Sequence, residues 1–318
     1  MHFIHSFLSI LSLTCISTIL TAANPIITEI FTADPAAMVY KETMYLYAGQ
    51  DDAKSEKDGY RMPRWVCYSS TDLKTWTAHG SPLSPKDFAW AKDSAWAGQV
   101  IERDGKFFWY VAVEHGSIRG KAIGVAVSDS PTGPFKDARG TALVTNDMTK
   151  AVGHSWDDID PTVFIEDNGQ AWLFWGNTKC YYAKLKADMI ELDGPIQTAT
   201  LEAFEEAPWL HRRNGLYYLS YASGFPERIA YSTSTSLSGP WTYKGILAEV
   251  AGNSNTIHQS IIEFKGDWYF IYHNGSMPRP NIGGSNRRAV CIDRLFYHAD
   301  GTMKRVVQTT EGLDAPAP

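Results

Sequence analysis

Three carboxylic acids in this sequence stand at matching places, each followed closely by a proline. They belong to the segments Asp34-Pro35, Asp160-Pro161 and Glu206-Ala207-Pro208. An aspartate before a proline is a common way to begin a strand, because proline disfavours helical backbone in the residue before it. Turn chemistry explains any one of these segments, but three acids at equivalent points of the chain indicate a shared function.

Acids gathered in one place are suited to hydrolysing a glycosidic bond. That reaction needs one protonated carboxyl, which donates to the leaving oxygen, and one ionised carboxylate, which attacks carbon or activates water. Where a water molecule must fit between them, the two groups lie about 6.5–9.5 Å apart and the anomeric configuration inverts. A third carboxylate nearby can raise the pKa of the acid and orient it.

The elements that must position these acids repeat along the chain. Five strands rich in aromatic and aliphatic residues lie 46–64 residues apart, beginning at Met44, Lys106, Gln170, Leu216 and Asp267. This spacing is typical of propeller blades. Each strand follows a turn, and the turns are Lys41-Glu42-Thr43, Asp104-Gly105, Asn168-Gly169, Asn214-Gly215 and Lys265-Gly266. Asp-Gly and Asn-Gly are strong signals of two-residue hairpins.

Further short strands before and after each of these five complete the repeat. No stretch beyond the first 23 residues has sustained helical periodicity. We therefore predict an all-β fold, a five-bladed β-propeller with four-stranded antiparallel blades. The first strand of each blade lines the central channel, so the residues that open these strands converge at one end of it: Asp34, Ala97, Asp160, Glu206 and His258. Like charges this close destabilise a fold unless chemistry, a cation or hydrogen bonds compensate.

Residues 1–23 predict a signal peptide, because an apolar run from Phe7 to Leu20 is followed by small residues. We expect a secreted or periplasmic protein in which residues 24–318 form one catalytic domain. No later segment is apolar enough to span a membrane, so no membrane contact is expected after removal of the signal. The net charge of -6 and the lack of a basic stripe argue against a nucleic-acid partner. Three cysteines remain after residue 23, which allows at most one disulfide.

Seven segments, taken in order, resemble glycoside hydrolase family 43 over nearly the whole chain after residue 23. They read ADPAAMVYKETMYLYAG, SAWAGQVIERDGKFFWYVAV, IGVAVSDSPTGPF, DIDPTVFIEDNGQAWLFWGN, EEAPWLHRRNGLYYLSYA, HQSIIEFKGDWYFIYHN and RRAVCIDRLFYHADGTM. The resemblance implies that Asp34 is the general base that activates water. It also implies that Glu206 is the general acid and that Asp160 modulates the pKa of that acid. Glu205 is adjacent and is expected to face the opposite side of its strand.

Further site residues follow from the same resemblance. It implies a structural calcium in the central channel that His258 contacts directly or through water, and no organic cofactor. It also implies that Arg288 binds the hydroxyls of the terminal sugar and neighbours the base, with Arg287 as the competing choice. Carbohydrate sites use exposed rings to stack on sugars, so Trp96 and Phe225 are expected to form walls of the pocket. Trp172 and Trp175 are expected to pack between blades instead.

The resemblance also implies action on plant cell-wall polysaccharides such as arabinoxylan and on xylo-oligosaccharides. We expect exo-acting hydrolysis that releases D-xylose and/or L-arabinose. The loops 51–64 and 146–158, the second of which carries His154 and Trp156, are expected to wall a pocket and so favour exo action. The alternatives are an endo-α-1,5-arabinanase, an exo-galactanase and a non-catalytic sugar-binding propeller. A metal-dependent hydrolase that uses His154 and His258 fits poorly, because the two are not spaced as a ligand pair.

Overall fold

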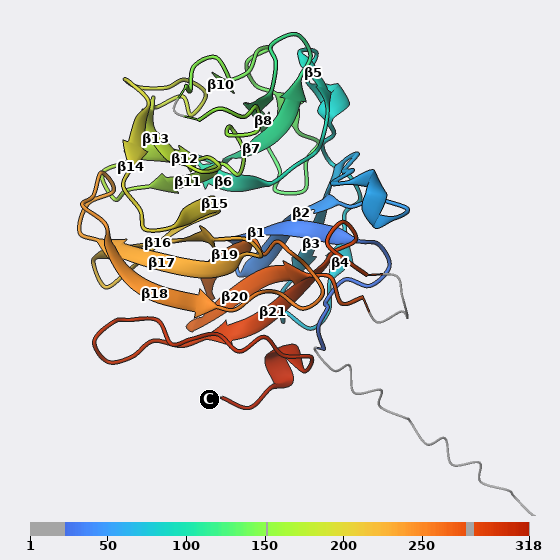
Figure 1. Cartoon of the computed structure of the whole chain (residues 1–318), viewed down its shortest axis with the longest axis vertical. Coiled ribbons are helices and arrows are strands. Elements are labelled where there is room, and N and C mark those ends of the chain that lie inside the picture. Colours follow the sequence, from blue (N-terminus) through green and yellow to red (C-terminus); the bar gives the residue numbers. More distant parts are fainter. Residues whose placement is uncertain (1–22, 151, 278–282, 318) are drawn as a thin grey trace, which may run out of the picture.

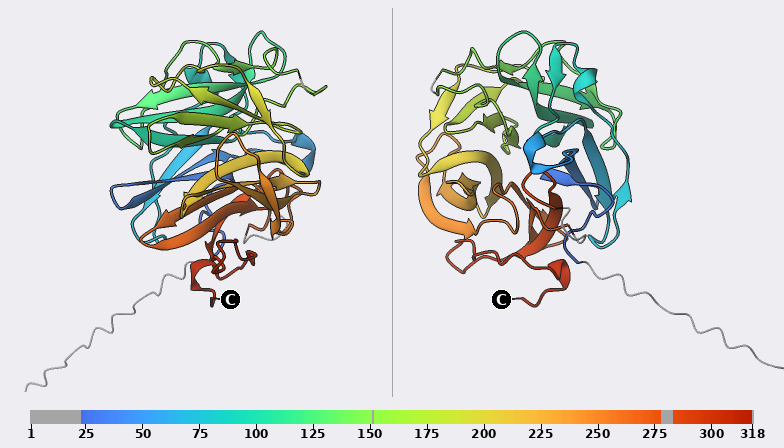
Figure 2. Two further views of the ribbon diagram at one scale, coloured as in Figure 1. Left: turned by 90° about the vertical axis from the view of Figure 1, so that its left-hand side faces the viewer. Right: turned by 45° about the vertical axis from the view of Figure 1, so that its right-hand side comes forward.

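Five antiparallel sheets follow one another along the chain and are arranged as blades around a ring (Figure 1, Figure 2). The structure is a computed structural model, and it describes residues 23–150, 152–277 and 283–317. The predicted five-bladed β-propeller is confirmed. The predicted signal peptide lies, except for Ala23, outside the described residues. Within the described residues, no helix has the length and apolar character needed to cross a membrane.

The strands take up most of the regular structure. The first blade contains β1 (Thr32–Tyr40), β2 (Thr43–Gln50), β3 (Trp65–Ser70) and β4 (Thr77–Ala78). The second contains β5 (Ala91–Asp93), β6 (Gly98–Arg103), β7 (Lys106–His115), β8 (Lys121–Ser128), β9 (Lys136–Asp137) and β10 (Val144–Thr145). The third contains β11 (Thr162–Ile165), β12 (Ala171–Trp175), β13 (Cys180–Leu185) and β14 (Gln197–Ala199). The fourth contains β15 (Phe204–Arg213), β16 (Leu216–Ser223), β17 (Arg228–Ser234) and β18 (Thr242–Ala248), and the fifth β19 (Gln259–Phe264), β20 (Asp267–Asn274) and β21 (Ala289–Leu295). Three short 3₁₀ helices are η1 (Glu56–Asp58), η2 (Pro85–Asp87) and η3 (Gly312–Asp314).

The four-stranded pattern holds in the first, third and fourth blades, while the other two depart from it. The second blade gains the short strands β5 and β10, and the fifth has three strands within the described residues. The segment that precedes β1 lies beside β21, where Ile26 N–H donates to the Val290 carbonyl (2.8 Å) and Thr32 N–H donates to the Arg288 carbonyl (3.0 Å). This early segment takes the outer place in the fifth blade and closes the ring.

The hairpin signals of the sequence are confirmed at four of the five turns. The first turn has positive φ at Lys41 and Glu42, and Asp104-Gly105, Asn214-Gly215 and Lys265-Gly266 each have positive φ at both residues. Such backbone matches the right-handed twist of the flanking strands. The predicted two-residue turn at Asn168-Gly169 is wrong, because β11 ends at Ile165 and β12 begins at Ala171. Within that wider loop the Asn168 side chain accepts the Gln170 N–H (2.8 Å) and forms a local turn of its own.

The hydrophobic core is divided into clusters that lie between neighbouring blades. One cluster joins Trp175 to Tyr110 and Val125 of the second blade, and another joins Trp172 to Leu219 of the fourth. The expected packing of both tryptophans between blades is therefore confirmed. The cysteines Cys67, Cys180 and Cys291 are buried and free.

Candidate active site

The three predicted acids lie where the first strands of their blades begin with distorted backbone. Asp34 (φ 54°), Asp160 (φ 58°) and Ala207 (φ 56°) all adopt left-handed backbone immediately before a proline. A conformation of this kind is costly for a residue other than glycine and persists only where the surroundings enforce it. The residue of the fourth blade that matches the two aspartates is therefore Ala207, and Glu206 lies one position earlier.

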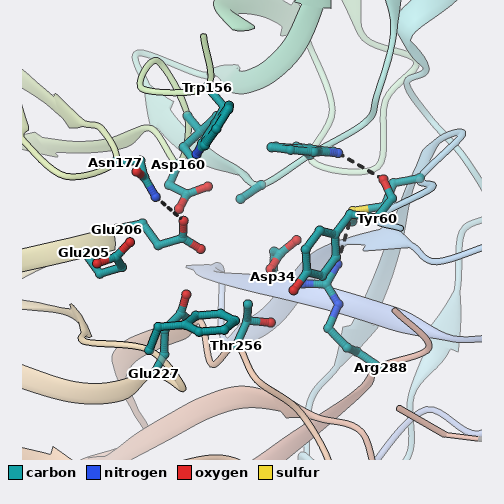
Figure 3. Close-up of a pocket in the computed structure, with 15 residues that line it drawn as sticks. Asp34, Tyr60, Trp156, Asp160, Asn177, Glu205, Glu206, Glu227, Thr256 and Arg288 are labelled. Carbon is teal, nitrogen blue, oxygen red and sulfur yellow. Dashed lines mark hydrogen bonds and ion pairs between the residues drawn. The ribbon is translucent and has the colours of Figure 1, made fainter. Parts of the chain in front are cut away.

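These strand openings meet at a pocket of about 310 Å³ (Figure 3). That volume is at the small end of the range for ligand sites. Blades one to four each contribute the residue that was predicted to converge, and the fifth contributes neighbouring positions instead of His258. The pocket is lined by Asp34, Tyr60, Met62, Trp96, Ala97, Trp156, Ile159, Asp160, Asn177, Glu205, Glu206, Phe225, Glu227, Thr256 and Arg288.

Asp34 is held as an ionised carboxylate. Its Oδ1 accepts a hydrogen bond from Arg288 Nη1 (3.0 Å), and the Nδ1 atoms of His273 and His258 lie 3.4 and 3.6 Å from the same oxygen. Burial by itself would raise the pKa of Asp34, but the positive charge of Arg288 and the hydrogen bond with His258 hold it well below its ordinary value. A carboxylate in this state can accept a proton only from a group activated by the reaction, such as the attacking water.

Arg288 is fixed between two acids. Its Nε and Nη2 donate to the two oxygens of Asp51, both at 2.9 Å, while Nη1 points to Asp34. The guanidinium is buried and lies 4.9 Å from the centre of the Tyr60 ring. Because a planar guanidinium offers several donors in a rigid geometry, Asp51 orients Arg288 so that Nη1 reaches Asp34.

His273 anchors Asp34 from the opposite side. The Asp34 backbone N–H donates to His273 Nδ1 (3.1 Å), and His273 Nε2 lies 3.1 Å from the Thr256 carbonyl. Burial, followed by the nearby charge of Arg288, lowers the pKa of His273 to about 3, so the ring is neutral. A neutral ring accepts at one nitrogen and donates at the other, which is the pattern these two contacts require.

Glu206 lies across the pocket from Asp34 in an environment that favours its protonated form. Burial raises the pKa of Glu206, while the hydrogen bond that Asn177 Nδ2 donates to Oε2 (2.7 Å) opposes the rise. Burial and the charge of Glu206 raise the pKa of Asp160 to about 8. Asp160 is also tied to the strand that carries Glu206, because the Ala207 N–H donates to Asp160 Oδ2 (3.0 Å). The surroundings of Asp34 and Glu206 therefore move the pKa values of the two acids in opposite directions.

The expected orientation of Glu205 is wrong. Glu205 lines the same pocket as Glu206. The two residues do not alternate between faces, because the pairing of β15 with β16 shifts on both sides of Glu206, between Phe204 and Glu206 and again before Trp209. A bulge of this kind re-aims side chains relative to the simple alternation of a strand.

Trp96 stands as one wall of the pocket, as the sequence predicted. Its indole N–H donates to the Tyr60 carbonyl (3.2 Å), and Tyr60 packs edge-on against the ring. Lys121 Nζ lies 3.7 Å from the ring centre, and this buried ammonium pairs with Glu114 at 3.3 Å. The cation occupies one face of the indole, which strengthens the hold on the ring and leaves the other face for a ligand.

The other predicted walls also reach the pocket. Phe225 lines it and keeps 68% of its surface exposed, and Trp156 lines it with 49% exposed. The His154 ring stacks on Trp156 with the centroids 4.3 Å apart. The loops 51–64 and 146–158 contribute Tyr60 and Trp156 respectively, so both loops form walls as expected.

Arg287 and His258 do not line the pocket. Arg287 pairs with Glu56 (3.3 Å), so Arg288 is the arginine beside Asp34. The part of the chain that the structure describes contains no group of three or more His, Cys, Asp or Glu side chains placed to hold a metal ion. Calcium prefers six to eight oxygen ligands, so an ion near His258 would take most of its ligands from water. The calcium contact stays a prediction, and no step below is routed through it.

Several residues of the site were not predicted from the sequence: Asp51, Tyr60, Asn177, Glu227, Thr256 and His273. They lie in loops or at strand ends and carry no motif of their own. Asn177 follows the strand end Trp175-Gly176, and Glu227 lies two residues after Phe225. Polar residues in the loop after a blade's second strand were the available signal, since the third and fourth blades place Asn177 and Glu227 in the pocket.

A five-bladed propeller with two acids of opposite pKa shift facing one another across a small pocket has the architecture of a glycoside hydrolase. The chain belongs to glycosyl hydrolases family 43, whose sequence model matches residues 22–303. It is 30% identical to the arabinoxylan arabinofuranohydrolase of Bacillus subtilis (strain 168), over 92% of this chain and 65% of that relative's length.

Solved structures agree with this assignment. An α-L-arabinofuranosidase from Clostridium thermocellum ATCC 27405 is 38% identical, with a TM-score of 0.75, over 92% of this chain and 98% of that one. A family 43 β-xylosidase/α-arabinofuranosidase from a compost microbial metagenome, in complex with xylotriose and in a calcium-free form, is 28% identical with a TM-score of 0.80. That match covers 90% of this chain and 97% of the other.

Proposed function

We propose that this protein is an inverting, exo-acting glycoside hydrolase that releases D-xylose and/or L-arabinose from plant cell-wall polysaccharides such as arabinoxylan and from xylo-oligosaccharides. The observation that carries the proposal is the pair Asp34 and Glu206. The two carboxyls face one another across the pocket (Figure 3), and their surroundings push their pKa values in opposite directions. Divergent pKa values in a pair of acids identify a base and an acid.

In the proposed reaction, Asp34 accepts a proton from water as the water attacks the anomeric carbon. Glu206 gives its proton to the glycosidic oxygen, the bond between that oxygen and the anomeric carbon breaks, and the leaving alcohol keeps the proton. Arg288 keeps Asp34 ionised before the attack and contributes a buried positive charge to the sugar site. Asp160 raises the pKa of Glu206 through its proximity and is tied to the Glu206 strand at Ala207.

The walls of the pocket support exo action on a small sugar. Trp96 offers one face of its ring, while Tyr60 and Trp156 come from the loops that rise beside it. A volume of about 310 Å³ favours a terminal sugar over the middle of a long chain. The names of the relatives support pentosides as substrates. We also propose export, on the strength of residues 1–23.

The test is hydrolysis of an aryl β-D-xyloside and an aryl α-L-arabinofuranoside side by side, with proton NMR of the first anomer released. We expect turnover of at least one of the two substrates, with inversion at the anomeric carbon. Retention of configuration would contradict the roles given to Asp34 and Glu206. Oligosaccharide products from linear arabinan, without free pentose, would favour the endo-arabinanase.

A further inference from the structure

A fifth acid enters the pocket on the loop between β16 and β17. Glu227 is only 3% exposed and lines the pocket beside Glu206. Its backbone N–H donates to the Asn255 carbonyl (2.9 Å), and its Oε2 accepts the Ile257 N–H (2.8 Å). Backbone and side chain are both tied to the segment before β19, so the carboxyl is held in one place.

The free side of the Glu227 carboxyl faces Glu206. Figure 3 shows the Glu227 carboxyl directed toward that of Glu206, and each carboxyl affects the pKa of the other. On its other side Glu206 accepts the Asn177 amide. Two carboxyl groups can form a hydrogen bond only when one of them carries a proton, because two carboxylates would repel. Two buried acids that face one another are therefore most stable with one proton between them.

The surroundings of the pair favour keeping that proton. Burial, and then the charge of Glu206, raise the pKa of Glu227 well above its ordinary value. Asp160, at the opening of β11, also raises the pKa of Glu227, and the Tyr60 hydroxyl lies nearby on the β2–β3 loop. His258 opposes these acids, since its positive charge lowers the pKa of Glu206 and of Asp160.

We propose that Glu227 shares the acid proton with Glu206 and holds the Glu206 carboxyl ready to donate it. This inference rests on the proposed function and gives Glu227 the part of a positioning residue. When Glu206 has given the shared proton to the leaving oxygen, both carboxyls are left ionised. Glu227 then takes a proton from solvent, and Asp34 releases to solvent the proton that it took from water, so the cycle balances.

A shared proton has a consequence that simple anchoring of the loop would not have. A coupled pair loses its protons in two steps, and the second step occurs at higher pH than it would for either acid alone. The proton thus remains available to Glu206 into the alkaline range. Glu227→Gln keeps the size of the side chain and an oxygen that can accept the Ile257 N–H. Its amide group can donate a hydrogen bond to Glu206 but cannot supply a proton.

The test compares the pH dependence of kcat/KM for wild-type enzyme and Glu227→Gln. Two aryl glycosides of the pentose that the wild type releases are needed, one with a 2,4-dinitrophenyl leaving group and one with 4-methoxyphenyl. The poor leaving group needs the acid proton and the good one does not. We expect the alkaline limb for the 4-methoxyphenyl substrate to move down by about one pH unit or more, with little change for the 2,4-dinitrophenyl substrate.

An unmoved alkaline limb in folded Glu227→Gln would overturn the proposal, and so would an equal loss with both leaving groups. Thermal unfolding of each variant reports folding. If the Gln variant does not fold, Glu227→Asp takes its place, with a shift of the same sign but smaller. The exposed Glu263→Gln on β19 controls for the loss of one negative charge. Failure of the wild type to release either pentose would contradict the proposed function. An alkaline limb that moves, or fails to move, in Glu227→Gln concerns the role of Glu227 alone.

Discussion

Replacing Arg288 by glutamine should raise the pH at which the general base stops working. Arg288 Nη1 lies 3.0 Å from Asp34 Oδ1. Coulomb's law at an effective dielectric constant of about 20 gives roughly 5 kcal/mol for two unit charges at that separation, of which desolvation of the pair offsets a part. Aspartates beside an arginine typically titrate about 1–3 pH units lower than they otherwise would. Asp34 works only when ionised, so the acidic limb of activity should move up by about that much.

The assay is kcat/KM against pH with the 2,4-dinitrophenyl glycoside, because that leaving group makes the rate independent of Glu206 and isolates the base. Arg287→Gln is the matched control, since this neighbouring arginine lies outside the pocket and pairs with Glu56. Its acidic limb should coincide with that of the wild type. A folded Arg288→Gln enzyme with the wild-type acidic limb would refute the assignment of Arg288 as the group that keeps Asp34 ionised.

The same substitution should affect stability. Removing one partner of a buried ion pair costs about 3–5 kcal/mol, because a buried charge is left uncompensated, and Arg288 compensates both Asp34 and Asp51. The depressed pKa of Asp34 stabilises the wild type above an ordinary aspartate pKa of about 4, and this contribution is lost as the pH falls further. Arg288→Lys keeps a positive charge but lacks the paired donors of a guanidinium. The acidic limb of its pH profile should therefore lie between that of the wild type and that of Arg288→Gln.

Three further outcomes are expected. Glu206→Gln should abolish turnover of oligosaccharides and leave the melting temperature close to wild type, because only the proton donor is lost; retained turnover would exclude Glu206 as the acid. Asp160→Asn should move the alkaline limb of kcat/KM to lower pH, because the pKa of Glu206 falls without its acidic neighbour, and an unmoved limb would count against its role as modulator. Trp96→Ala should lower kcat/KM about ten-fold, mainly by raising KM, because roughly 1–2 kcal/mol of apolar burial of the sugar is lost. An unchanged KM would show that the sugar does not contact the ring.

Local patterns predicted the ring and half of the site. Aromatic strands and Asn-Gly turns act through neighbouring residues, so the blades could be read from the sequence, and the acids before prolines marked the strand openings. Glu227 and His273 had no comparable pattern, because each is recruited by a contact with another blade or loop. Glu205 was misplaced because a bulge in β15 interrupts the alternation on which the prediction rested.

The closure of the ring has a consequence for how activity arises during synthesis. Asp34 and Asp51 leave the ribosome early, whereas Arg288 follows after more than two hundred further residues, on the edge that receives the segment before β1. A nascent chain with four finished blades already contains every proposed acid but lacks the guanidinium that keeps the water-activating one charged. The charge on Asp34 is therefore secured only once the last blade has met the first, so the pH range over which the base is ionised depends on completed assembly.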